Sequence, residues 1–239
     1  MNRAAPDRLP PGDGKVNGGW RRPAGSLPQD VGLGQSVGMA RVTADITVSA
    51  DGYSSGPNQS KDDPLGEQGE RLHEWMFAHA ADHEDEIAAI LEARAYIMGR
   101  NMFGPVRGEW TGDWQGWWGP EPPYHHPVFV LTHHPRESVE MLGGTTFHFV
   151  TDGPEAAMVR AREAAGDGDI AIAGGADTLN QFLALGLVDV LRLHVAPMTL
   201  GISEHREVVR VFDGVPARRL KPAHVRATPH VTHMTYELH

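Results

Sequence analysis

The pattern of apolar and polar residues changes near residue 40 of this chain. Residues 1–38 are rich in glycine and proline and show almost no apolar periodicity, so we expect a disordered extension there. From Val42 to Ser49 apolar and polar residues alternate, which predicts a strand that ends at Ala50-Asp51-Gly52. We therefore expect one folded domain over residues 39–239.

Helices and strands follow one another through the middle of the chain. Apolar residues at helical spacing predict helices over Leu72–His79 and Ile87–Leu91. Short apolar runs predict strands at Ala95–Met98, Val128–Leu131 and Thr146–Val150. Such alternation is typical of a sheet that is covered by helices.

The second half repeats this order and closes with two strands. Pro154 suits the first turn of a helix that runs to Ala165. The further expected elements are a strand over Ile170–Gly174, a helix to Leu185, a strand over Val188–Val195, and an antiparallel pair at Val225–Thr228 and Val231–Leu238. The sequence therefore predicts a three-layer α/β fold, whose central sheet is mixed, mostly parallel and ends in an antiparallel hairpin.

The most informative stretch is Ile170–Leu179, where an apolar strand ends in Gly174-Gly175 and an amphipathic helix follows at once. Neither glycine carries a Cβ, so the backbone can approach a ligand closely. The unpaired amides and the dipole of a helix start suit a phosphate. The same pair would also make a simple tight turn, and the spacing alone does not separate these two interpretations.

Composition limits the classes of function. A net charge of −10 argues against non-specific nucleic-acid binding. No apolar run is long enough for a membrane helix, and no apolar leader begins the chain, so we expect a cytoplasmic protein without membrane contact. The absence of cysteine excludes disulfides, thiolate metal sites and a cysteine nucleophile.

Three expected strands end at residues that suit an anionic ligand: Gly99-Arg100, Thr132-His133 and Gly174-Gly175. In open α/β sheets ligands collect at the carboxyl ends of strands. Arg100 offers a bidentate fork for phosphate, and Thr132 offers a hydroxyl. Each has a structural explanation as well, a surface cation for Arg100 and a strand-end cap for Thr132. Together the three ends predict a site for one phosphorylated cofactor.

Several short motifs occur in a fixed order along the chain. They are Ser49-Ala50-Asp51-Gly52, Met98-Gly99-Arg100, Val130-Leu131-Thr132, Ala173-Gly174-Gly175, Gly186-Leu187-Val188-Asp189 and Ala196-Pro197-Met198-Thr199-Leu200-Gly201. This set resembles the dihydrofolate-reductase-like family, and more closely its branch related to the C-terminal reductase domain of bifunctional riboflavin-biosynthesis deaminase-reductases. The resemblance covers residues 39–239.

The resemblance implies an NADPH-dependent reductase. It places Gly99 and Arg100 beside the cofactor phosphates, and Thr132 and His133 near the adenosine ribose and its 2′-phosphate. The residues implied to hold the pyrophosphate are Gly174, Gly175, Ala176, Asp177 and Thr178. Homodimerisation is a further expectation from family relatives.

On the substrate side the resemblance places Asp51 and Gly52 at the nicotinamide and substrate loop. Asp51 is the first candidate for orienting substrate, Glu74 a candidate acid, and Trp75 a possible pocket edge. The expected substrate is a small heterocycle or a ribosylamino-pyrimidine that is reduced at a C=N or C=O bond. Two departures from the family, Val190 after Asp189 and Leu72 in place of an acid, argue against dihydrofolate itself.

The sequence also carries a metal-like spacing, since His79 and His83 lie four residues apart with Asp82 and Glu86 nearby. His79 falls on the apolar stripe of its expected helix. We therefore interpret His79 as a packed core residue and predict no metal site.

The loop over residues 104–127 contains four tryptophans. Such rings suggest a lid over a flat heterocycle or an interface patch, and the sequence does not separate the two.

Two further classes of function compete with a reductase. A nucleophilic hydrolase is disfavoured, because Ser49 and Ser54 lie outside a Gly-x-Ser-x-Gly elbow. A noncatalytic NADPH- or ligand-binding module of the same fold is the stronger competitor, and the sequence leaves it open.

Overall fold

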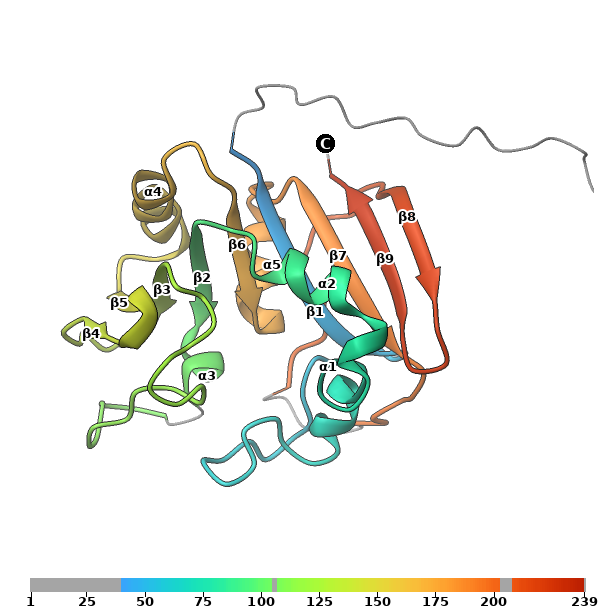
Figure 1. Cartoon of the computed structure of the whole chain (residues 1–239), viewed down its shortest axis with the longest axis horizontal. Helices are drawn as coiled ribbons and strands as arrows, with labels where there is room; N and C mark the ends of the chain where they lie inside the picture. The colour runs from blue at the N-terminus through green and yellow to red at the C-terminus, as the bar shows by residue number, and fades with distance from the viewer. Residues whose placement is uncertain (1–39, 105–106, 203–207, 239) are drawn as a thin grey trace, which may run out of the picture. The chain divides into compact units, whose positions relative to one another are not determined.

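A computed structural model describes residues 40–104, 107–202 and 208–238 (Figure 1). The expected disorder of residues 1–38 lies outside the described residues. The described strands are β1 Val42–Ser49, β2 Ala95–Gly99, β3 Pro127–Leu131, β4 Val139–Glu140, β5 Thr146–Val150, β6 Ile170–Gly174, β7 Val190–Ala196, β8 Lys221–Ala227 and β9 Thr232–Glu237. The α-helices are α1 Glu74–Phe77, α2 Glu84–Ile90, α3 Arg100–Phe103, α4 Pro154–Ala165 and α5 Ala176–Ala184.

These strands form one mixed sheet in the order β4-β5-β3-β2-β6-β1-β7-β9-β8. The six strands from β5 to β7 run parallel to one another, so their carboxyl ends lie at one edge of the sheet. Strand β9 pairs antiparallel with β7 and with β8. The expected fold class, with its C-terminal antiparallel hairpin, is confirmed.

Strand β1 is buried along its whole length, on both faces. Its apolar residues, such as Ala44 and Ile46, join a core cluster with side chains of α4 and α5. Its polar residues Thr43, Asp45 and Thr47 face the opposite side, where α1 and α2 lie over β1 and β7 (Figure 1). A polar layer is therefore enclosed between the sheet and the α1–α2 segment.

The tryptophan-rich segment after α3 covers the other half of this second face. Trp118 stacks on Phe147 with ring centroids 5.7 Å apart, and Trp114 Nε1 donates to the Phe103 carbonyl at 2.8 Å. Trp110 packs edge-to-face on Phe149. These half-buried rings thus complete a hydrophobic cluster within the chain. The sheet contacts one side of these rings, and their role as a lid or as an interface patch stays a prediction.

Some element boundaries differ from the expected ones. Strand β8 begins at Lys221, four residues before its expected start, and the two-residue strand β4 was not anticipated. In place of the helix expected over Leu72–His79, the chain forms a 3-10 turn over Gly69–His73 and then the four-residue helix α1. A separate 3-10 turn follows at Ala80–Asp82. The apolar stripe therefore ends early, and the expectation of a core position for His79 was wrong: its ring is half-exposed and stacks on His230.

None of the helices in the described ranges combines the length and apolar character that a membrane crossing requires.

The buried Asp45 carboxylate is neutralised by Arg192 of β7. Two hydrogen bonds join the side chains, at 2.6 Å from Nε and 2.9 Å from Nη2, and the register places the two residues directly opposite. Burial raises the pKa of Asp45, but His194 and Arg192 lower it more, so this pKa lies below its usual value. The carboxylate is therefore charged at neutral pH.

We predict that Asp45→Ala lowers the free energy of unfolding by about 3 kcal/mol, because it leaves a partly buried guanidinium without its counter-ion. Adding Arg192→Met should recover part of this loss. The matched control is Asp152→Asn, which breaks an exposed pair with Arg160 and should cost less than about 1 kcal/mol. Urea unfolding gives the free energy of unfolding of the wild-type protein, the two single variants and the Asp45→Ala/Arg192→Met double variant. Equal losses for Asp45→Ala and Asp152→Asn would contradict the prediction.

Candidate functional site

The parallel strands bring the expected site residues to one edge of the sheet, the lower edge in Figure 1. Helix α3 starts at Arg100 directly after β2, and α5 starts at Ala176 just after β6. Thr132 follows β3 and Asp51 follows β1. Because β2 pairs with both β3 and β6, the first three of these ends are close neighbours.

The starts of α3 and α5 touch through Gly99. A Cβ on Gly99 would lie 2.3 Å from Thr178 Oγ1, well inside contact distance. Its φ of −78° is ordinary, so the requirement for glycine is steric and not conformational. The contact between Gly99 and Thr178 places the first turns of the two helices side by side.

The glycine pair leads directly into α5. The Gly174–Gly175 peptide bond is cis, and Gly174 has a φ of +117°, which favours glycine. A Cβ at Gly175 would meet no atom of the described residues within 4 Å, so this backbone has open space beside it. Within the described part of the chain no side chain caps the start of α5, and uncapped amides of a first turn suit an anion. The carboxylate of Asp177 accepts a hydrogen bond from Gln181 at 2.9 Å.

Arg100 is a cation on the strand β2 side of this turn. Its guanidinium carbon lies 3.8 Å from the centroid of the Trp110 ring, and Arg136 lies 5.1 Å from the same centroid. Burial and the nearby charge of Arg107 lower the pKa of Arg100, although this group remains a cation. Its Nε and Nη2 are buried and have no hydrogen-bond partner among the described residues. Buried donors of this kind are rare without a ligand.

At the end of β3 the side chain of Thr132 caps its own turn. Its hydroxyl accepts a hydrogen bond from the His134 amide at 3.1 Å, as expected for a strand-end cap. The next residue, His133, is exposed. The ring of His134 turns toward Glu109, 3.1 Å away.

Asp51 holds the loop after β7. Its two carboxylate oxygens accept hydrogen bonds from the amides of Leu200 and Gly201, at 3.0 and 2.8 Å. Partial burial raises the pKa of Asp51, but hydrogen bonds from Ser49 and these amides outweigh this effect and bring the pKa below its usual value. Asp51 is therefore an ionised anchor for the loop. Gly52, at a φ of +90°, approaches the side chain of Arg210.

The two remaining substrate-side residues differ in environment. Glu74 is exposed and lies 3.8 Å from Arg71 in a surface ion pair. Trp75 is fully buried, and its Nε1 donates to Thr47 Oγ1 at 3.2 Å. The ring of Trp75 therefore packs within the domain, and its expected contact with substrate has no counterpart in this geometry.

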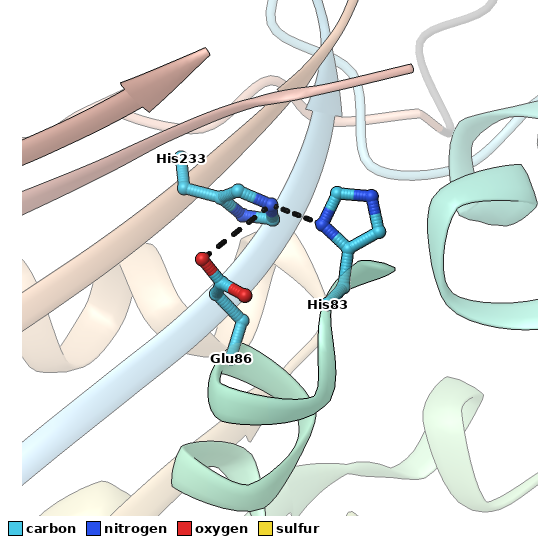
Figure 2. Close-up of side chains that lie close together, drawn as sticks. All are labelled: His83, Glu86 and His233. Atoms are coloured by element: carbon cyan, nitrogen blue, oxygen red, sulfur yellow. Dashed lines mark hydrogen bonds and ion pairs between the residues drawn. The ribbon is translucent and has the colours of Figure 1, made fainter. Parts of the chain in front are cut away.

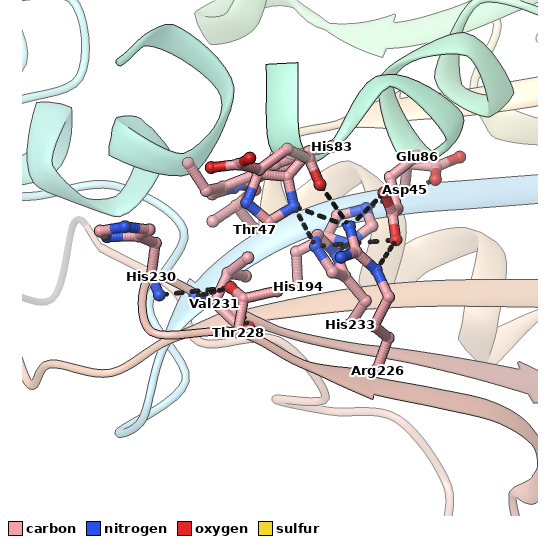
Figure 3. A network of polar contacts seen from close by, with 12 residues as sticks. Asp45, Thr47, His83, Glu86, His194, Arg226, Thr228, His230, Val231 and His233 are labelled. Atoms are coloured by element: carbon pink, nitrogen blue, oxygen red, sulfur yellow. Dashed lines mark hydrogen bonds and ion pairs between the residues drawn. The ribbon is translucent and has the colours of Figure 1, made fainter. Parts of the chain in front are cut away.

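Sequence reasoning missed a chain of buried histidines beside Trp75 (Figure 3). His194 Nδ1 lies 2.7 Å from His233 Nδ1, and His233 Nε2 lies 2.9 Å from His83 Nδ1. All three rings contact the Trp75 ring. The sequence carried one signal for a buried polar layer, which was the acidic residue Asp45 inside the predicted strand Val42–Ser49.

Comparisons with known proteins identify the family. A family model for the RibD C-terminal domain matches residues 40–234. The chain belongs to the RibD C-terminal domain family. This membership relates it to the reductase-like domains of riboflavin biosynthesis.

Solved structures agree with the family in fold. A crystal structure from Shewanella sp. PV-4, described as a candidate riboflavin biosynthesis protein, is 21% identical with a TM-score of 0.55; the match covers 83% of this chain and 99% of that one. Acinetobacter baumannii RibD is 17% identical with a TM-score of 0.53, over 84% of this chain and 58% of that one. No curated protein matches this RibD-type chain.

The contact between Gly99 and Thr178 generates a steric prediction for this RibD-type domain. Gly99→Ala should lower the free energy of unfolding by about 1–3 kcal/mol, since the new methyl group overlaps the Thr178 hydroxyl. Thr178→Ala should rescue the variant, because the next atom, Thr178 Cβ, lies 3.5 Å away. Thermal unfolding of the single and double variants measures this. A double variant no more stable than Gly99→Ala alone would contradict the steric explanation.

His73 generates a prediction about pH. Burial, helped by the charge of His194, lowers the pKa of His73 to about 4 from a usual value of 6.5. The unfolded chain therefore binds a proton between pH 6.5 and 4 that the folded chain does not, and stability falls as the pH falls through this window. His73→Gln should make this loss shallower, whereas the half-exposed His79→Gln should leave it unchanged. Urea midpoints from pH 7.5 to 4.5 test the difference.

Proposed function

We propose that this chain is an NADPH-dependent reductase that transfers a hydride to a C=N or C=O bond of a small heterocycle or a ribosylamino-pyrimidine. The observation that carries the proposal is Arg100, whose buried, unpartnered nitrogens lie at the strand edge that also holds the glycine turn. A guanidinium in this state suits a phosphate, which accepts two parallel hydrogen bonds. Family membership supports the reductase class.

The chain's own groups fit the anionic parts of such a cofactor. The amides at the start of α5 would receive the pyrophosphate, and the exposed backbone at Gly175 allows close approach. Arg100 would bind a phosphate group. Thr132 and His133 remain the proposed neighbours of the adenosine 2′-phosphate, with the exposed His133 ring as the free donor of the two. When bound, the nicotinamide supplies the hydride.

On the substrate side the chain's part is orientation. Asp51, ionised and held by two loop amides, fixes the loop after β7 against β1 and does not donate a proton. Gly52 keeps the adjoining backbone free of a side chain. Glu74 stays a candidate acid, and water is a second proton source at an exposed site. Homodimerisation and a cytoplasmic location belong to the same proposal, as expectations from the family resemblance and the sequence.

The second candidate is a noncatalytic NADPH-binding module, because Arg100 and the α5 amides serve binding equally well in both. Turnover of a substrate separates the reductase from the binding module. Oxidation of NADPH in the presence of pterins, deazaflavin precursors or pyrimidine ribosylamines supports the reductase. Tight NADPH binding without turnover of any of these compounds supports the module.

We predict that Arg100→Met weakens NADPH binding at least ten-fold, since it removes charge-assisted hydrogen bonds worth about 1.5–3 kcal/mol. The matched control is Arg162→Met, which changes an exposed arginine in the last turn of α4 and should leave the Kd unchanged. Titration of each protein with NADPH and NADH, followed by fluorescence, measures the Kd. An unchanged Kd for Arg100→Met, or equal weak binding of both nucleotides by the wild-type protein, would sink the cofactor assignment.

A further inference from the structure

His83, Glu86 and His233 form a compact cluster between the start of α2 and strand β9 (Figure 2). His83 is the residue before α2, Glu86 lies in the first turn of α2, and His233 lies on β9. His83 Nδ1 and His233 Nε2 are 2.9 Å apart, and Glu86 Oε1 is 3.9 Å from His233 Nε2. Two imidazole nitrogens and a carboxylate oxygen thus converge on one point.

The register of the sheet extends this cluster inward. Arg226 of β8 lies opposite His233, and His233 lies opposite His194 of β7. His194 Nε2 in turn lies 3.6 Å from Asp45 Oδ1 (Figure 3). The result is a line of contacts that begins at a guanidinium, a group that only donates, and ends at a carboxylate, a group that only accepts.

With neutral rings this line cannot match a donor to an acceptor at every contact. If His83 Nδ1 accepts from Arg226 Nη2, 3.1 Å away, then His233 donates from Nε2, His194 donates from Nδ1, and the lone pair of His194 Nε2 faces the Asp45 carboxylate. If His83 Nδ1 instead donates to His233, the line is matched as far as Asp45, but the N–H of His83 then faces Arg226 Nη2, whose two protons go to the Asp82 carbonyl at 2.8 Å and to Glu86 Oε2 at 2.9 Å. One end of the line is therefore unmatched in either arrangement.

A metal ion in the cluster removes the mismatch. We propose that His83 Nδ1, His233 Nε2 and Glu86 bind a divalent transition-metal ion of the Zn²⁺ class. His233 then donates from Nδ1 to His194 Nδ1, and His194 donates from Nε2 to Asp45. Every contact from the ion to Asp45 is matched while all rings stay neutral. A ligating histidine whose other nitrogen is fixed through hydrogen bonds to a carboxylate is the usual arrangement around protein metal sites.

The ligand chemistry determines the class of ion. Two imidazoles and one carboxylate suit Zn²⁺ and related ions, and leave one tetrahedral position for water. Ligands at about 2.0–2.1 Å in a tetrahedral site are roughly 3.4 Å apart, so the two nitrogens need to separate by only about 0.5 Å. The ion would join α2 to the β8–β9 hairpin, which are far apart in the sequence.

Arg226 is the competitor for this position. Its guanidinium donates to both oxygens of Glu86, at 2.7 and 2.9 Å, and so holds the cluster with a positive charge of its own. The Arg226 side chain is 37% exposed and lies on β8, the edge strand of the sheet, so it can turn into solvent when an ion enters. The proposal therefore predicts opposite effects for substitutions of Glu86 and Arg226.

The test uses the untagged full-length protein, stripped with a chelator and titrated with Zn²⁺ in competition with a chromophoric chelator. One equivalent should bind. Glu86→Gln and His83→Asn should weaken Zn²⁺ binding at least ten-fold, and asparagine keeps a good capping residue at the start of α2. Arg226→Gln should strengthen binding several-fold, because it removes the competing cation. His79→Asn is the matched control and should have no effect. Co²⁺ should give the visible spectrum of a tetrahedral site.

Three results would overturn the proposal. They are the absence of Zn²⁺ binding by both the wild-type protein and Arg226→Gln, binding that persists unchanged in His83→Asn, and weaker binding in Arg226→Gln with its fold intact by circular dichroism. The first would mean that the ion pair of Arg226 with Glu86 holds the cluster without an ion. The second would place the ion elsewhere among the fourteen histidines of the chain. None of these results bears on NADPH binding, so the two proposals fail separately.

Discussion

The carboxylate of Asp45 lies inside the sheet on a strand with no exposed face, and much of one side of the domain is arranged around it. An isolated buried charge is too costly to persist, so the neighbouring strand β7 supplies both Arg192 and His194. The β7–β9 pairing then places His194 and His233 on the same face, and Trp75 covers them. The α1–α2 segment therefore lies on a polar layer, whereas α4 and α5 lie on an apolar one.

The opposite constraint acts at the strand edge, where parallel strands leave their carboxyl ends close together and exposed. Glycines occupy two positions at this edge. At Gly99 the starts of α3 and α5 are too close for a Cβ, and at Gly175 the backbone has open space beside it. Arg100 lies beside these turns with two donors that no described residue satisfies. The two regions thus differ: in the closed polar network the Nε2 atoms of His83 and His194 lack partners among the described residues, whereas the open strand edge leaves donors of Arg100 unsatisfied.

Local signals predicted most of the elements, because apolar periodicity and Gly or Pro boundaries are properties of short segments. They predicted β1, β2, β6 and the Gly174-Gly175 turn into α5. They failed where distant residues decide the outcome. The helix over Leu72–His79 broke, and Trp110 and its neighbours packed on the sheet. Distant residues also decide the surroundings of Asp51, whose two oxygens accept hydrogen bonds from the amides of Leu200 and Gly201, 149 and 150 positions later; its role in orienting substrate stays a prediction.

The sequence by itself determined the order of strands and helices, the glycine turn and the strand ends that suit a phosphorylated cofactor, since each depends on residues that are adjacent in the chain. Only the tertiary structure decided which polar residues meet. His83 and His233 are 150 positions apart, and strand register alone aligns Arg226, His233 and His194. Register depends on pairings summed over the whole sheet, so no local pattern of residues could show that these side chains share one line of contacts.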